Sequence, residues 1–119
     1  MKSYTDITQS KKLAEFLFIE SADGFYEAQH NPLTDKWEYI FFTDNKWASE
    51  EVVIPAWSLA ALLDILPNGT ETHKQVNESI SCYFVEVYNN KKYFSTERYD
   101  NLLDACYDMI LKLHEEKLL

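Results

Sequence analysis

Apolar side chains recur at helical spacing in three stretches of the chain. In the first, Leu13, Phe16 and Leu17 share one face of a helix predicted over residues 7–18, and Asp6 is placed to cap it with Gln9 as reciprocal partner. In the last, a helix is predicted over residues 102–117 behind the capping residue Asn101. Its apolar stripe consists of Leu102, Cys106, Met109, Ile110 and Leu113.

The middle stretch, PAWSLAALLDILP, runs from Pro55 to Pro67 and is apolar almost all round. Pro55 suits a first helical position, and Pro67 predicts that the helix ends near Leu66. As a helix the stretch is about 20 Å long, whereas a bilayer core is about 30 Å thick. We therefore predict a buried helix in which Leu62→Ala or Leu63→Ala costs about 2–5 kcal/mol.

Alternation of apolar and polar residues predicts strands in the first half of the chain. Residues 24–30 alternate loosely, and NPLTD follows as a loop. Residues 36–43 alternate clearly, with Trp37, Tyr39 and Phe41 on one face. A turn at 44–45, a returning strand at 46–49 and a short strand at 51–54 are predicted next.

The second half contains the clearest hairpin, residues 82–96. Asn89 and Asn90 tolerate the positive φ of a two-residue turn, which places Glu86 opposite Tyr93 and Val85 opposite Phe94. The polar residues 67–79 before it indicate a surface loop, the most mobile segment of the chain. Together these elements predict an α+β fold: one domain, residues 1–119, with a small antiparallel sheet built from hairpins and packed against about three helices, N-terminal, central and C-terminal.

Charge excludes some classes of function. The net charge is −9, from 20 acidic and 11 basic residues. Clustered Lys and Arg, which bind phosphates, are missing, so direct nucleic-acid binding is disfavoured, as is binding to anionic membranes. Two cysteines are too few for a disulfide-stabilised secreted domain, and no apolar run follows Lys2, so we expect a cytoplasmic protein with reduced thiols.

Candidate catalytic and metal-binding chemistry is sparse. His30, His73 and His114 lie too far apart for a local metal motif, so neither a metal nor a cofactor is predicted. Cys106 belongs to the last apolar stripe and has acidic neighbours, which favours a core thiol over a nucleophile; Cys82 is interpreted in the same way. No catalytic residue is predicted, and an enzyme is less favoured than a binding protein.

The leading hypothesis is a non-enzymatic protein-interaction or accessory factor, similar to an inhibitor or immunity protein. Its acidic surface would meet a basic partner protein. The carrying residues would be Asp100, Asp104, Asp108, Glu50 and Glu51. A solvated acidic face without a partner is the alternative for the same residues.

Two other hypotheses come from different classes. Trp37, Tyr39 and Tyr93 could line an aromatic pocket of a small-molecule-binding protein or enzyme. Alternatively, apolar residues left exposed could mediate a homodimer of a structural module.

A resemblance covers the helices and their borders. The segments KKLAEFLFIESAD, IPAWSLAALLDILP and NLLDACYDMILKLHEEKLL resemble short uncharacterised proteins of gut Bacteroidetes and their phages or mobile elements. The resemblance implies a bacterial or phage origin in the cytosol. It implies no activity and assigns no residue.

Overall fold

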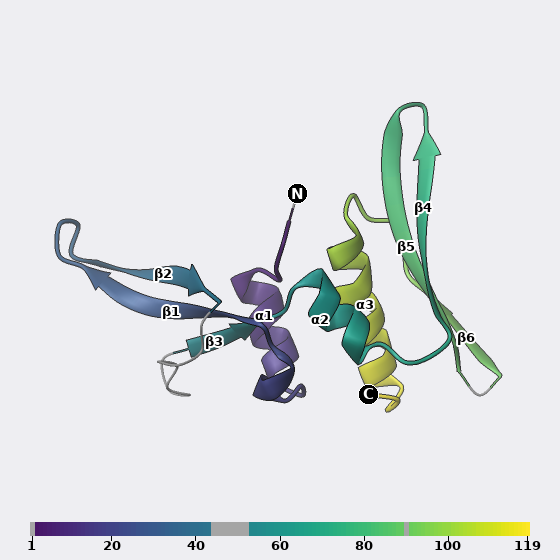
Figure 1. The fold of residues 1–119 in the computed structure, drawn as a ribbon, viewed down its shortest axis with the longest axis horizontal. Helices are drawn as coiled ribbons and strands as arrows, with labels where there is room; N and C mark the ends of the chain where they lie inside the picture. Colours follow the sequence, from purple (N-terminus) through teal and green to yellow (C-terminus); the bar gives the residue numbers. More distant parts are fainter. Residues whose placement is uncertain (1, 44–52, 90) are drawn as a thin grey trace. The chain divides into compact units, whose positions relative to one another are not determined.

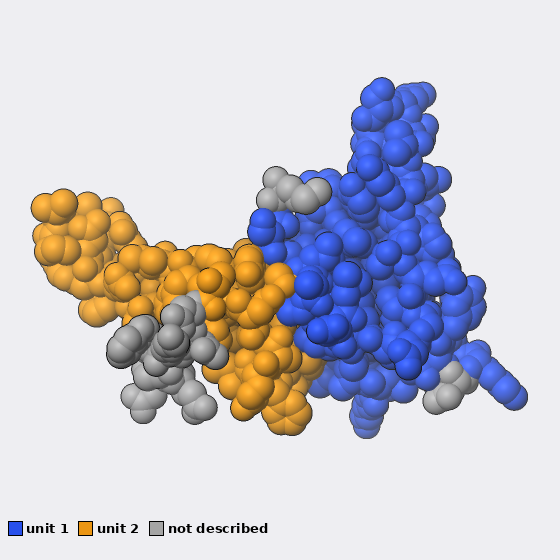
Figure 2. All heavy atoms as spheres, viewed as in Figure 1, with its two compact units in different colours: residues 1–3, 59–119 blue, residues 4–58 orange. Residues whose placement is uncertain are grey.

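The structure, a computed structural model, describes residues 2–43, 53–89 and 91–119. The chain divides into two compact units: residues 1–3 and 59–119 form unit 1, and residues 4–58 form unit 2 (Figure 2). The described part of each unit contains a three-stranded antiparallel sheet and at least one helix. The predicted α+β class is therefore confirmed, with two small sheets in place of the expected one.

Unit 2 begins with helix α1, Ile7–Ala14, and a short 3₁₀ helix, Ile19–Ser21. Its strands are β1, Gly24–Asn31, β2, Lys36–Phe42, and β3, Val53–Ala56, in the order β2-β1-β3 (Figure 1). The predicted cap of α1 is confirmed, because Asp6 Oδ1 accepts from the Gln9 backbone N–H at 2.8 Å and Gln9 Oε1 accepts from the Asp6 N–H at 3.1 Å. The helix ends at Ala14, four residues earlier than predicted, and Phe18 is exposed.

The core of unit 2 forms around Trp57, which is fully buried. Its indole Nε1 donates to Ser21 Oγ at 2.9 Å, and its backbone N–H donates to the buried Thr5 Oγ1 at 3.1 Å. Tyr26 donates its hydroxyl to the Thr5 carbonyl at 2.8 Å. These bonds satisfy the polar groups that burial takes away from water.

Pro55 lies in strand β3 and not at the start of a helix, so that prediction was wrong. It pairs with Phe25 of β1. Among the described strands β3 is an edge of its sheet, and an edge strand tolerates a proline because one of its sides needs no ladder hydrogen bonds. The helix that follows, α2, spans Leu59–Ile65, and Pro67 lies beyond its end as predicted.

Unit 1 is layered. Helix α3, Leu102–Glu115, packs against strand β5, Ile80–Asn89, and α2 packs against α3 (Figure 1). Asn101 caps α3 by accepting from the Asp104 N–H at 2.8 Å, as predicted. The core residues of α3 and β5 are fully or almost fully buried: Val85, Val87, Leu103, Cys106, Met109, Ile110 and Leu113.

Helix α2 is buried on one side only. Leu62 is fully buried, whereas Leu63 is 39% exposed. The expectation that both leucines are buried was therefore wrong for Leu63. The helix has only seven residues and one helical neighbour in unit 1 with which it packs extensively, so its far side meets solvent.

The polar segment predicted as a loop contains strand β4, Thr70–Asn77, which pairs with β5. Both faces of this strand are polar, so no alternation revealed it. The residues of the connecting turn, Glu78 and Ser79, have φ of 49° and 72°, as a two-residue type I′ turn requires.

The predicted hairpin at 82–96 exists, formed by β5 and β6, Lys92–Ser95, but its register was wrong. Asn89 pairs with Lys92, and Tyr93 faces Tyr88 instead of Glu86. Lys91 has φ of 69°, so the turn lies one residue later than predicted and each pairing shifts by two. The turn predicted at 44–45 and the strand at 46–49 lie outside the described residues.

Candidate functional site

The β1–β2 hairpin, a long two-stranded ladder in Figure 1, leaves apolar side chains exposed on both faces. Trp37 and Tyr39, on one face of β2, are 71% and 47% exposed, and Ile40, on the other face, is 44% exposed. Leu33 in the connecting turn is 94% exposed. Trp37 and Tyr39 are two large aromatic side chains exposed on the same face of one strand, and exposed apolar groups that lie together on a surface mark interaction sites.

Polar contacts hold the tip of this hairpin in one shape. The Asp35 N–H donates to the Asn31 carbonyl at 2.8 Å, and the Leu33 N–H donates to Asn31 Oδ1 at 3.0 Å. His30 Nε2 lies 2.9 Å from Asp35 Oδ1, and the His30 ring packs against Trp37 with centroids 5.5 Å apart. Trp37 is thus presented on an ordered framework, which lowers the entropy cost of binding.

A close approach of rings fixes the base of the same hairpin. Phe41 packs against Tyr4 and Tyr26, with ring centroids 4.6 and 5.3 Å apart. A Cβ at Gly24 would lie 2.7 Å from the Phe41 ring and 2.8 Å from the Tyr4 ring. Glycine at this position lets the rings close over the strand.

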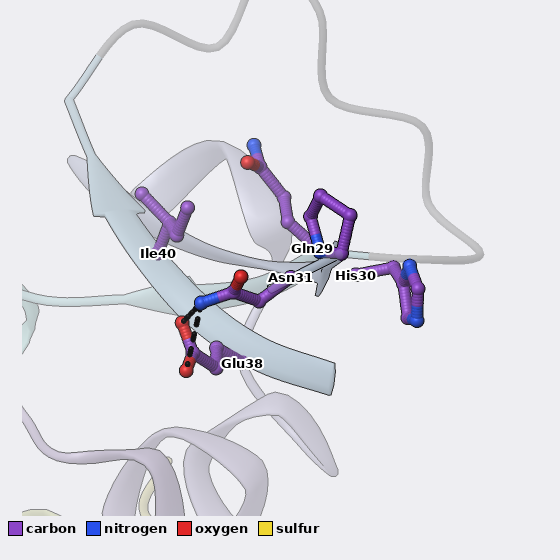
Figure 3. A pocket seen from close by; sticks show the side chains of 6 residues that line it. Gln29, His30, Asn31, Glu38 and Ile40 are labelled. Carbon is purple, nitrogen blue, oxygen red and sulfur yellow. Dashed lines mark hydrogen bonds between the residues drawn. The ribbon is translucent and has the colours of Figure 1, made fainter. Parts of the chain in front are cut away.

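A cavity of about 230 Å³ lies on the hairpin (Figure 3). It is lined by Gln29, His30, Asn31, Pro32, Glu38 and Ile40. Two of these lining residues are joined by a hydrogen bond, in which Asn31 Nδ2 donates to the Glu38 carboxylate at 3.4 Å (dashed lines in Figure 3). Pockets for drug-sized ligands usually have volumes of about 300–1,000 Å³, so this cavity suits a single side chain of a partner better than an organic ligand.

The three residues predicted to share an aromatic pocket belong to different units. Trp37 and Tyr39 lie on β2 of unit 2, and Tyr93 lies on β6 of unit 1. None of the three lines the cavity on the hairpin. Tyr93 packs instead against Tyr88, with centroids 4.9 Å apart, and donates its hydroxyl to Glu86 Oε2 at 2.5 Å, which raises its pKa.

Two of the predicted partner-binding acids have partners within unit 1. Asp104 Oδ1 accepts from Lys2 Nζ at 2.9 Å, and Asp108 Oδ1 lies 3.9 Å from Lys112 Nζ. Burial, together with the hydrogen bond to Asp108, raises the pKa of Tyr99 to about 12.

The other three predicted partner-binding acids are not part of these ion pairs. Asp100 is exposed and accepts from Asn101 Nδ2 at 3.0 Å. Glu50 and Glu51 lie outside the described residues. The acidic surface as a partner-binding site stays a prediction.

Both cysteines are free thiols. Cys106 is fully buried on α3, as predicted, and burial raises its pKa to about 12. A thiol that stays protonated is a poor nucleophile. Cys82 lies within β5 and is partly exposed.

One group of polar side chains escaped sequence analysis. Glu71 and His73 lie at alternate positions of β4, and Glu71 pairs with Glu86 of β5. His73 Nε2 lies 2.9 Å from Glu86 Oε1 and 3.4 Å from Glu71 Oε2. The signal was the Glu-x-His spacing of a strand, which was missed because residues 67–79 were interpreted as a loop.

No family model matches the chain, and neither a curated protein nor a solved structure matches it. The resemblance to proteins of gut Bacteroidetes therefore stays a prediction. Among the described residues, no helix is long and apolar enough to cross a membrane.

Proposed function

We propose that the protein is a non-enzymatic interaction protein that binds a partner protein through its β1–β2 hairpin. The observation that carries the proposal is the exposure of Trp37, Tyr39, Ile40 and Leu33 on one ordered hairpin. Trp and Tyr are enriched among the residues that dominate protein interfaces, because each buries a large area at a small entropy cost.

The charge of the chain favours a basic partner. The net charge is −9. Residues 24–42, which form the hairpin, contain three acidic residues, Glu27, Asp35 and Glu38, and one lysine, Lys36. Acidic groups around an apolar centre steer a cationic protein to the site and add little to its final affinity. We further propose that the protein is a cytoplasmic accessory factor that engages a cationic protein, since both cysteines are free thiols.

Affinity purification from the native host tests the proposal. We expect Trp37→Ser and Tyr39→Ser, separately and together, to lose the captured partner. Tyr88→Ser is the matched control, because Tyr88 is an exposed aromatic on the β5 strand of unit 1. Capture that survives the double substitution contradicts the proposal.

A second variant tests the alternative acidic surface. Asp100→Lys reverses an exposed charge at the start of the Asp100, Asp104 and Asp108 series without breaking the Lys2–Asp104 ion pair. If Asp100→Lys abolishes capture while Trp37→Ser and Tyr39→Ser do not, the binding surface lies on unit 1 and not on the hairpin.

The same exposed side chains favour a second candidate function, self-association. A second copy of the chain would bury them in a symmetric dimer. Measurement of the solution mass at micromolar concentration distinguishes the two: a monomer supports a separate partner, whereas a dimer that Trp37→Ser dissociates makes the chain its own partner.

A further inference from the structure

We propose that Glu71, His73 and Glu86 form a binding site for a divalent transition-metal ion of the zinc type. The three side chains lie on the same face of the β4–β5 ladder in unit 1, so the site is independent of the hairpin in unit 2. One nitrogen and two carboxylate oxygens, one from each residue, all lie within 4.8 Å of one another.

The distances match the edges of a coordination sphere. With metal–ligand bonds of about 2.0–2.2 Å, neighbouring ligands of an octahedral or tetrahedral ion lie about 3.0–3.5 Å apart. The His73 Nε2 atom lies 2.9 Å from Glu86 Oε1 and 3.4 Å from Glu71 Oε2. The Glu71 carboxylate is 61% exposed, so a side-chain rotation is enough to adjust its oxygen to an ion.

The short contacts of His73 are ion pairs when the ring is protonated, but none of them has the geometry of a hydrogen bond. The Nε2 atom of His73 is buried and has no hydrogen-bond partner among the described residues, although a carboxylate oxygen lies 2.9 Å away. Because this distance is short enough for a hydrogen bond and none is formed, the oxygen lies off the direction of a ring N–H. Adjacent metal ligands have this relation to one another, because each points at the ion instead of at its neighbour.

Neighbouring side chains orient two of the three ligands. The His73 ring stacks on Phe84, with centroids 4.6 Å apart and planes 13° apart. Tyr93 donates to Glu86 Oε2 at 2.5 Å, which leaves Oε1 to face His73. Partners of this kind fix ligand orientation in metal sites and contribute to metal affinity.

The ligand chemistry selects the class of ion. An imidazole nitrogen beside two carboxylates suits Zn²⁺ and its first-row neighbours, whereas Mg²⁺ and Ca²⁺ prefer oxygen ligands. In the register of the sheet the two glutamates stand directly opposite one another, an arrangement that repels and that a cation between them relieves. Three protein ligands leave further coordination positions to water or to an oxygen of another molecule.

Calorimetric titration of Zn²⁺ into the tag-free full-length protein at about pH 7.5 tests the proposal. A Cys82→Ser background removes the partly exposed thiol as a competing ligand. We expect one ion per chain. His73→Phe keeps the stack on Phe84 but removes the nitrogen, and Glu86→Gln and Glu71→Gln remove a carboxylate; each should weaken binding by at least about tenfold.

His30→Asn is the matched control. His30 also lies 2.9 Å from a carboxylate, that of Asp35, but among the described residues it belongs to no group of three potential metal ligands. The His30→Asn substitution should leave Zn²⁺ affinity unchanged. Glu71→Gln alters an exposed side chain and should stay folded, as far-UV circular dichroism can verify. Absence of Zn²⁺ binding in the Cys82→Ser protein, or equal binding after His73→Phe or Glu71→Gln, overturns the proposal.

Discussion

The β1–β2 hairpin of unit 2 and the β4–β5 hairpin of unit 1 are both antiparallel ladders with short connections, but their edge strands β2 and β4 expose different side chains. The central strand β5 exposes Ile80 and Tyr88 as well. Strand β2 exposes Trp37, Tyr39 and Ile40, whereas β4 exposes mostly charged and polar residues and has Val76 near its tip. A long hairpin in this chain therefore does not need apolar side chains on its outer strand. Their presence on β2 calls for another reason, which the proposed partner binding would supply.

Apolar residues that serve only the fold should be buried if exposure on β2 reflects partner binding. Leu62 and Leu63 of α2 test that expectation at neighbouring positions, since Leu62 is fully buried and Leu63 is 39% exposed. Leu62→Ala should lower the free energy of unfolding by about 2–5 kcal/mol, measured in urea. Leu63→Ala should cost less than about 1 kcal/mol, and equal costs for the two variants would show that α2 is not one-sided.

Alkaline pH should destabilise the core that supports the β4–β5 hairpin. The Cys106 thiol has a pKa of about 12 when folded, against 9.0 as the ordinary value. Between these values the unfolded chain binds fewer protons than the folded chain. Stability is therefore retained below about pH 9 and falls above it, by up to about 1.4 kcal/mol per pH unit for this thiol.

The measurement is urea unfolding at about pH 8 and about pH 10, for wild type and for Cys106→Ala. Other groups titrate alike in both proteins, so the difference between them isolates the thiol. Cys106→Ala should lose less stability over this interval than wild type. Parallel losses would mean that Cys106 is accessible to water.

A substitution at Gly24 should destabilise the base of the β1–β2 hairpin without touching its exposed part. In Gly24→Ala the new methyl group lies 2.7 Å from the Phe41 ring and 2.8 Å from the Tyr4 ring, so both rings must shift. We expect a loss of about 1–2 kcal/mol in urea unfolding. A neutral result would place the Phe41 ring outside the packed base.

The smallest effect on stability is expected at Trp37. Because its side chain is 71% exposed, Trp37→Ser should change the free energy of unfolding by no more than about 0.5 kcal/mol. The same variant should lose its partner in affinity capture. A large loss of stability would assign Trp37 to the fold and end the contrast between the two hairpins.

Local signals predicted much of this fold. Caps at Asp6 and Asn101, the apolar stripe of α3 and the strand β2 each depend on near neighbours, and all four are present in the structure. The alternation along β2 does not separate a buried face from an exposed one, because all its residues except Phe42 are exposed. Strand β4 was missed because its residues are polar on both faces, and only pairing with β5 makes them a strand. Pro55 was misplaced because a proline suits an edge strand as well as a helix start.

The candidate sites were harder to predict than the fold. Trp37 and Tyr39 were predicted as binding residues, but in one pocket with Tyr93, which belongs to the other unit. No metal site was predicted because no two histidines are near one another in the sequence. The group around His73 instead uses carboxylates that the pairing of β4 with β5 brings close. Both candidate sites depend on burial and on strand register. Burial and register cannot be inferred from the local pattern of residues.

Site-specific photo-crosslinking in the native host tests the central claim most directly. A photoreactive phenylalanine derivative would replace Trp37 on β2 in one variant and Lys74, exposed on β4, in the other. We predict a discrete crosslinked protein from position 37 and none from position 74. No product at position 37, or the same product from both positions, would contradict the assignment of the β1–β2 hairpin as the interaction surface.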